Sequence, residues 1–154
     1  MDETSKQLVS ETRLPLPPEP RQPRHEDYEH KRCGVANLFL LVEPLSGWRE
    51  LQVTERRARA DWAEAMRVLA DQHYPSAERI TVVLDNLNTH GPASFYEAFA
   101  PAEARRLAER FEFHYTPRHG SWLNIAEIGF SVLSRQCLDR RIGEIETLAS
   151  ETRA

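Results

Sequence analysis

The sequence lacks any run of about 18 apolar residues, and no basic segment followed by an apolar one stands near its start. The first absence argues against a membrane-spanning helix, and the second argues against a secretory signal. The two cysteines, Cys33 and Cys137, are too few for a disulfide framework and lack the paired spacing of a zinc site. We therefore expect a cytoplasmic protein that does not contact a membrane.

A basic excess is also absent, because the formal net charge is −4 and the isoelectric point is near 5.9. Domains that bind phosphate backbones usually carry an excess of Lys and Arg, so any contact with nucleic acid must be local. With 154 residues and 40% hydrophobic content, the chain is long enough for one α/β domain over residues 1–154. It is too short for a catalytic domain plus a separate DNA-reading module.

The first part of the chain is polar and rich in proline. Residues 2–10 are weakly patterned, and the segment 14–23 holds five prolines, which lack the amide donor that a helix or a sheet needs. We predict a loop insertion over residues 11–33. Its polar stretch 24–32 has two interpretations, a solvated linker or a binding element, and the composition favours the linker.

The middle of the chain alternates between strand and helix patterns. The apolar run 37–42 predicts a strand covered on both faces, a turn follows at 44–47, and a second strand is expected at 48–53. Apolar residues spaced for one helical face predict a helix over 58–73. The same reasoning gives a strand at 80–84, a helical region at 92–110 interrupted at Pro101, a strand at 111–115 and a last helix from Leu123.

Two acidic residues stand where an α/β protein places functional groups. Asp85 follows the strand 80–84, although the alternative is a simple turn closed with Asn86. Glu127 lies on the polar side of the last helix beside Asn124, and its alternative is a solvated carboxylate. The opposite side of that helix forms a broad apolar stripe, which is expected to face the core. The residues of this stripe are Ile125, Ala126, Ile128, Phe130, Val132, Leu133 and Cys137.

Two longer motifs contain these acids, Leu84-Asp-Asn-Leu-Asn-Thr-His90 and Pro117-Arg-His-Gly-Ser-Trp-Leu-Asn-Ile-Ala-Glu127. They resemble signatures of the DDE transposases of bacterial insertion sequences related to the mariner superfamily. In that family a strand ends in Asp-Asn-x-x-x-His, and Pro-x-x-x-Ser-Trp-Leu-Asn-x-x-Glu opens the last catalytic helix. The resemblance covers nearly the whole chain, including the Asp-Glu pair at Asp2.

The resemblance implies an RNase H-like fold, a mixed sheet with flanking helices. It assigns Asp2, Asp85 and Glu127 as the catalytic carboxylates, which would hold Mg²⁺ or Mn²⁺, with two ions expected. The apolar strand that would lead into Asp2 is missing, so the first strand is expected to be incomplete. The helix-turn-helix DNA-binding region of the family is also absent, so we expect an N-terminally truncated chain.

The implied function is metal-dependent DNA strand cleavage followed by transfer of the freed 3′-hydroxyl to target DNA. The implied partners are double-stranded DNA at transposon ends and target, and a second copy of the chain in a DNA-bound homodimer. The protein would associate with the bacterial nucleoid when it acts.

Two alternatives remain: an inactive fragment that retains DNA or partner binding, and a simple RNase H-like nuclease. Further candidates for DNA contact, or for support of the carboxylates, are Asn86, His90, Arg118, His119 and Asn124.

Overall fold

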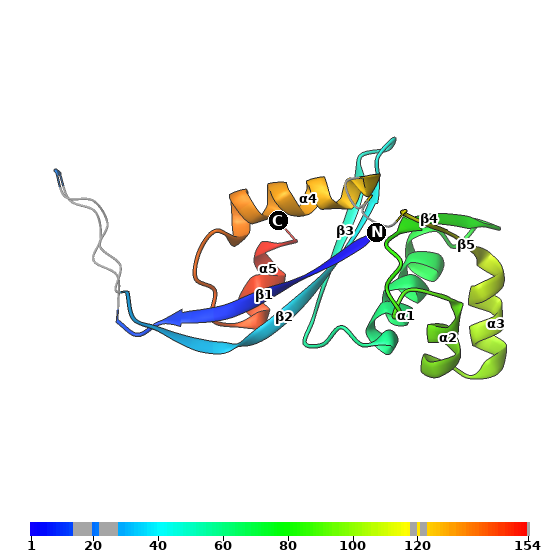
Figure 1. Cartoon of the computed structure of the whole chain (residues 1–154), viewed down its shortest axis with the longest axis horizontal. Helices are drawn as coiled ribbons and strands as arrows, with labels where there is room; N and C mark the ends of the chain where they lie inside the picture. Colours follow the sequence, from blue (N-terminus) through cyan, green and yellow to red (C-terminus); the bar gives the residue numbers. More distant parts are fainter. Residues whose placement is uncertain (14–19, 22–27, 118–119, 121–122, 154) are drawn as a thin grey trace.

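A computed structural model describes residues 1–13, 20–21, 28–117, 120 and 123–153. Strands and helices alternate along most of the chain, as an α/β protein requires (Figure 1). In chain order the elements are β1 (Asp2–Glu11), β2 (His30–Glu43), β3 (Trp48–Thr54), α1 (Arg59–Val68), a π-helical turn (Leu69–His73), β4 (Ile80–Leu84), α2 (Pro92–Ala98), α3 (Pro101–Arg110), β5 (Phe111–Tyr115), α4 (Ile125–Leu133), a second π-helical turn (Ser134–Leu138) and α5 (Ile145–Glu151).

The first three strands form an antiparallel sheet in the order β1-β2-β3. Asp2 is opposite Leu40, and Glu11 is opposite His30 at the far end of the same ladder. The half of β2 from Ala36 to Leu41 is buried, whereas its first residues are exposed. Beyond the core, β1 and β2 therefore continue together as a projecting two-stranded ribbon (Figure 1).

This ribbon corrects the prediction for the start of the chain. Residues 2–10 belong to a ten-residue strand that was not predicted, and β2 begins at His30, seven residues before the predicted strand at 37. The loop expected over residues 11–33 is thus shorter at both ends. The first residues of β2 are exposed and β1 is mostly polar and half-buried. Main-chain hydrogen bonds therefore hold the two strands without the apolar alternation on which a sequence prediction depends.

The other two strands, β4 and β5, form a separate parallel pair in which Ile80 is opposite Phe111. Both strands, the helix break at Pro101 and the hairpin of β2 with β3 confirm the sequence predictions. The α/β class and its compatibility with an RNase H-like fold are confirmed. The expected mixed sheet is present as two sheets, one antiparallel and one parallel.

The core has two clusters on either side of the antiparallel sheet. One contains Trp62, Phe95 and Leu107 from α1 to α3 together with Phe39 of β2. The other contains Phe130 of α4 and its neighbours on α5 and β2. Within the described part of the chain, no helix has the length and apolar character needed to cross a membrane.

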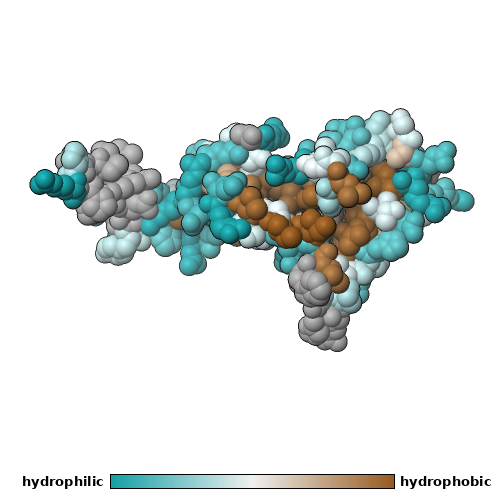
Figure 2. Space-filling model, turned by 90° about the horizontal axis from the view of Figure 1, so that it is seen from above, coloured by the Kyte–Doolittle hydropathy of each residue, from teal (hydrophilic) through white to brown (hydrophobic). Residues whose placement is uncertain are grey.

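Helix α4 packs very closely on β2 because of Gly129. A Cβ atom there would stand 2.6 Å from Cδ2 of Leu40, so a larger residue would push the helix away unless Leu40 moved. The apolar stripe predicted for α4 is buried only in part. Ala126 and Phe130 of this stripe are buried, whereas Ile125 and Ile128 are 49% and 62% exposed. Figure 2 shows a hydrophobic band on the face of the molecule seen there.

Candidate active site

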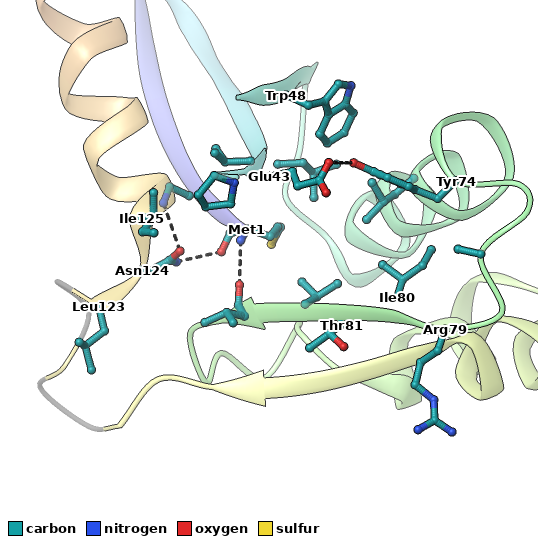
Figure 3. Close-up of a pocket in the computed structure, with 18 residues that line it drawn as sticks. Met1, Glu43, Trp48, Tyr74, Arg79, Ile80, Thr81, Leu123, Asn124 and Ile125 are labelled. Carbon is teal, nitrogen blue, oxygen red and sulfur yellow. Dashed lines mark hydrogen bonds between the residues drawn. The ribbon is translucent and has the colours of Figure 1, made fainter. Parts of the chain in front are cut away.

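The elements that carry the three predicted carboxylates meet at the backbone of Met1. Its amino nitrogen donates to the carbonyl oxygen of Val83 in β4 at 2.7 Å. Its carbonyl oxygen accepts a 2.9 Å hydrogen bond from Nδ2 of Asn124, which precedes α4 (Figure 3). Two hydrogen bonds therefore tie the start of β1 to the end of β4 and to the start of α4.

This junction brings together acids that are far apart in the sequence. Asp2 directly follows Met1, Asp85 lies two residues after Val83, and Glu127 lies three residues after Asn124. Each of the three acids therefore lies within three residues of a backbone or side-chain group that these two hydrogen bonds hold in place. The residue patterns placed Asp85 and Glu127 at the ends of separate elements, and only the family resemblance implied that the two ends meet.

Electrostatics indicate that the three carboxylates share one region. Burial is the largest influence that raises the pKa of Asp2, and the negative charges of Asp85 and Glu127 raise it further. Such an influence requires side chains within Coulombic reach of one another. Among the described residues, however, no three Asp, Glu, His or Cys side chains are arranged closely enough to hold a metal ion as they stand.

Asn124 has a structural role in this arrangement. Its side chain is buried, and its Oδ1 accepts a 3.3 Å hydrogen bond from the amide of Ala126, which caps α4. Its Nδ2 is the donor to Met1. Glu127 follows in the first turn, where the helix dipole favours a negative charge.

His90 connects Asp85 to a fourth carboxylate. Its Nδ1 is 2.6 Å from Oδ1 of Asp85, and its Nε2 is 3.2 Å from Oε2 of Glu3. An imidazolium ring satisfies both contacts, since it carries a proton on each nitrogen. Burial by itself lowers the pKa of His90, but the bond to Glu3 and the charges of Glu3 and Asp85 outweigh burial and raise it.

Glu3 is a site residue that sequence reasoning missed. Its side chain is 4% exposed and also faces Nη1 of Arg57 at 3.6 Å. A strand over residues 2–10 would have placed Asp2 and Glu3 on opposite faces, and that alternation was the available signal. Of the remaining predicted residues, Asn86 is exposed in the segment after β4. Arg118 and His119 lie outside the described residues.

A pocket of about 440 Å³ opens beside the Met1 junction. Its walls come from the end of β2, from β4 and from the start of α4 (Figure 3). Trp48 and Tyr74 close the far end, where the Tyr74 hydroxyl donates to Glu43 at 2.7 Å. Met1 itself lines the pocket.

The buried amino group of Met1 makes stability depend on pH. Burial lowers the pKa of this ammonium group from 8.0 to about 6, against the opposing charges of Asp2 and Asp85. Between pH 6 and 8 the unfolded chain keeps the proton and the folded chain loses it. The unfolding free energy should therefore rise with pH across this window, by on the order of 3 kcal/mol.

Chemical denaturation of the free and Nα-acetylated chains at several pH values checks this expectation. Acetylation removes the titrating amine but leaves an N–H for Val83. The difference in unfolding free energy between the two chains should shrink from pH 5 to pH 9. A difference that stays constant would show that the amino group is not buried in the folded protein.

Comparison with known families gives one match. The family model described as DDE superfamily endonuclease matches residues 1–149, which include all four carboxylates and His90. Neither the curated proteins nor the solved structures gave a significant match.

Proposed function

Because the chain belongs to the DDE superfamily endonuclease family, we propose that it cleaves DNA strands with divalent metal and transfers the freed 3′-hydroxyl to target DNA, as a transposase does. The observation that carries this proposal is the junction at Met1, which brings the ends of β1, β4 and α4 together. Each of those ends carries one of the predicted acids. The family supports the nuclease chemistry, and strand transfer is the finer part of the proposal.

The donor set fits a hard divalent cation. Mg²⁺ and Mn²⁺ prefer oxygen ligands. The charges of Asp85 and Glu127 contribute to the raised pKa of Asp2, and a cation between the carboxylates would offset this repulsion. Asp2, Asp85 and Glu127 would hold the metal once their side chains turn toward one another. When bound, two ions would lower the pKa of the attacking water or 3′-hydroxyl and stabilise the leaving oxygen at phosphorus.

The remaining residues of the site position these ligands. His90 engages Oδ1 of Asp85, so Oδ2 is the oxygen of Asp85 that this bond leaves available. Asn124 fixes both the first turn of α4 and the carbonyl of Met1, and it thereby places Glu127 relative to Asp2. Side chains held in this way need less ordering when a metal and a phosphate bind.

We propose double-stranded DNA as the substrate and a homodimer as the DNA-bound form. The ribbon of β1 and β2 supports this view, because it extends away from the helices α1 to α3 (Figure 1) and the first residues of β2 are exposed. A ribbon of this kind can reach a second protomer or a duplex. The net charge of −4 requires that contact with phosphates be confined to local basic groups.

Thermal unfolding with and without Mn²⁺ or Mg²⁺ tests the metal site. At a metal concentration one hundred times the dissociation constant, binding should stabilise the chain by about 2.7 kcal/mol. Asp85→Asn and Glu127→Gln should each remove this gain. The matched controls are Asp139→Asn and Glu146→Gln, which change exposed acids elsewhere, Glu146 also in the first turn of a helix. Equal shifts in all five proteins would contradict the proposed site.

Product analysis separates the proposed function from its alternatives. A labelled duplex that carries the element's end should give a nicked strand and then a joined product with target DNA. A nuclease without strand transfer would give the nick alone. An inactive fragment that retains DNA binding would shift the duplex on a gel and leave it intact.

A further inference from the structure

Glu3 is a buried carboxylate beside the proposed metal site, and it does not share a face with Asp2. Successive side chains of a strand point to opposite sides, so the two acids cannot both face the same cation without distorting β1. The Glu3 side chain is 4% exposed. A carboxylate is seldom buried to this degree unless hydrogen bonds or opposite charges compensate for its lost hydration. The residues that do so for Glu3 therefore indicate its role.

Those partners form a chain of contacts that ends at Asp85. Arg57, in the segment after β3, faces Oε1 of Glu3, and His90 faces Oε2. The other ring nitrogen of His90 reaches Oδ1 of Asp85 at 2.6 Å. Charges of alternating sign thus run from Arg57 through Glu3 and His90 to Asp85, across segments more than 80 residues apart in the sequence.

The His90 ring is also held from the side. It stacks against Trp62, with 5.8 Å between ring centroids and 25° between the planes. Its backbone amide donates to Leu87, and its carbonyl oxygen accepts from the hydroxyl of Tyr115 at 3.0 Å. With the backbone of His90 fixed, its imidazole can move only by rotation about the side-chain bonds, and the stack with Trp62 limits that rotation. The contact with Glu3 opposes that rotation at the ring nitrogen farthest from the backbone.

We propose that Glu3 is a positioning residue that acts through His90 to hold Asp85 in the orientation that binds metal. This inference rests on the proposed function. Without the Glu3 carboxylate, the buried Nε2 proton of His90 loses its acceptor, and the ring turns or shifts to find another. Asp85 then loses its fixed donor and must be ordered by the metal itself, which weakens binding.

The test measures Mn²⁺ affinity by calorimetry on the full chain, at a temperature where every variant is folded. Glu3→Ala should raise the Mn²⁺ dissociation constant by about tenfold or more, as the loss of a residue that orients a ligand does. Glu3→Gln keeps an acceptor oxygen on a side chain of the same length, so it should raise the Mn²⁺ dissociation constant by less. Glu112→Ala is the matched control, because Glu112 also contacts a histidine and an arginine, His114 and Arg79, but on the surface. It should leave the affinity unchanged.

A second measurement follows the His90 ring by ¹⁵N NMR in the absence of metal. Glu3→Ala should change the signals of both ring nitrogens, including Nδ1, which contacts Asp85 and not Glu3. If the unaltered chain binds no Mn²⁺, the proposed metal site fails, and the Nδ1 signal still decides whether Glu3 positions Asp85. An unchanged Nδ1 signal, or an unchanged affinity in folded Glu3→Ala, would overturn the proposal. Should Glu3→Ala not fold, Glu3→Asp decides, because its shorter carboxylate must weaken binding more than Glu3→Gln does.

Discussion

Replacement of Asp85 by Asn should reduce DNA strand cleavage in Mg²⁺ by on the order of a thousandfold. A bound metal contributes several kcal/mol of charge stabilisation in the transition state, and each 1.36 kcal/mol changes the rate tenfold. The amide has the size of the carboxylate and still offers an oxygen to His90, so the fold and the contact survive. What is lost is the negative charge that the cation requires.

Nicking of a supercoiled plasmid, followed over time with purified chain and Mg²⁺, measures this effect. The control is Asp139→Asn, the same change at an exposed position outside the junction. It should retain the full rate. Equal rates for Asp85→Asn and the unaltered chain would mean that Asp85 is not a metal ligand, and that another residue or a contaminating nuclease cleaves the DNA.

Replacement of Trp62 by Ala should destabilise the fold by about 3 to 5 kcal/mol, a large part of the roughly 5 to 15 kcal/mol of a typical domain. Trp62 is fully buried and contacts the rings of Phe95, Phe113 and His90. Its removal leaves a cavity in the core and takes away the surface on which His90 stacks. The unfolding free energy and the Mn²⁺ affinity should therefore fall together. Urea denaturation measures the first, and a Mn²⁺ titration measures the second.

The matched variant is Trp62→Phe. Among the described residues, Nε1 of Trp62 is buried without a hydrogen-bond partner. A phenyl ring removes that unsatisfied N–H, which offsets part of the lost volume. Trp62→Phe should therefore lower the unfolding free energy by much less than Trp62→Ala does. Comparable losses for both variants would show that the indole nitrogen is satisfied in solution.

The sequence predicted correctly those elements in which the order of apolar and polar side chains reflects burial. β4 and β5 and the break at Pro101 agree with the prediction, because buried strands are continuously apolar and proline interrupts a helix. It failed for the ribbon of β1 and β2, which depends on main-chain pairing between polar residues. For the apolar stripe of α4 it was right for Ala126 and Phe130 and wrong for Ile125 and Ile128. The face of α4 that meets the sheet also carries the small Gly129, which lets the helix approach Leu40 closely.

The candidate site was predictable only in part for a related reason. Asp85 and His90 are close in the sequence, so their contact follows from one short motif. Glu3 and the bonds of Met1 to Val83 and Asn124 join segments separated by more than 80 residues. No local pattern encodes such contacts, because they depend on how the two sheets and α4 pack against one another.

The Met1 junction also determines when the site can form during synthesis. The N-terminal residue and Val83 leave the ribosome well before Asn124 and Glu127. A nascent chain that still lacks α4 has two of the three acids, and its Met1 carbonyl lacks the hydrogen bond from Asn124. Under the proposed function, the metal site would become complete only with the last helices, and partly translated products should leave DNA uncut.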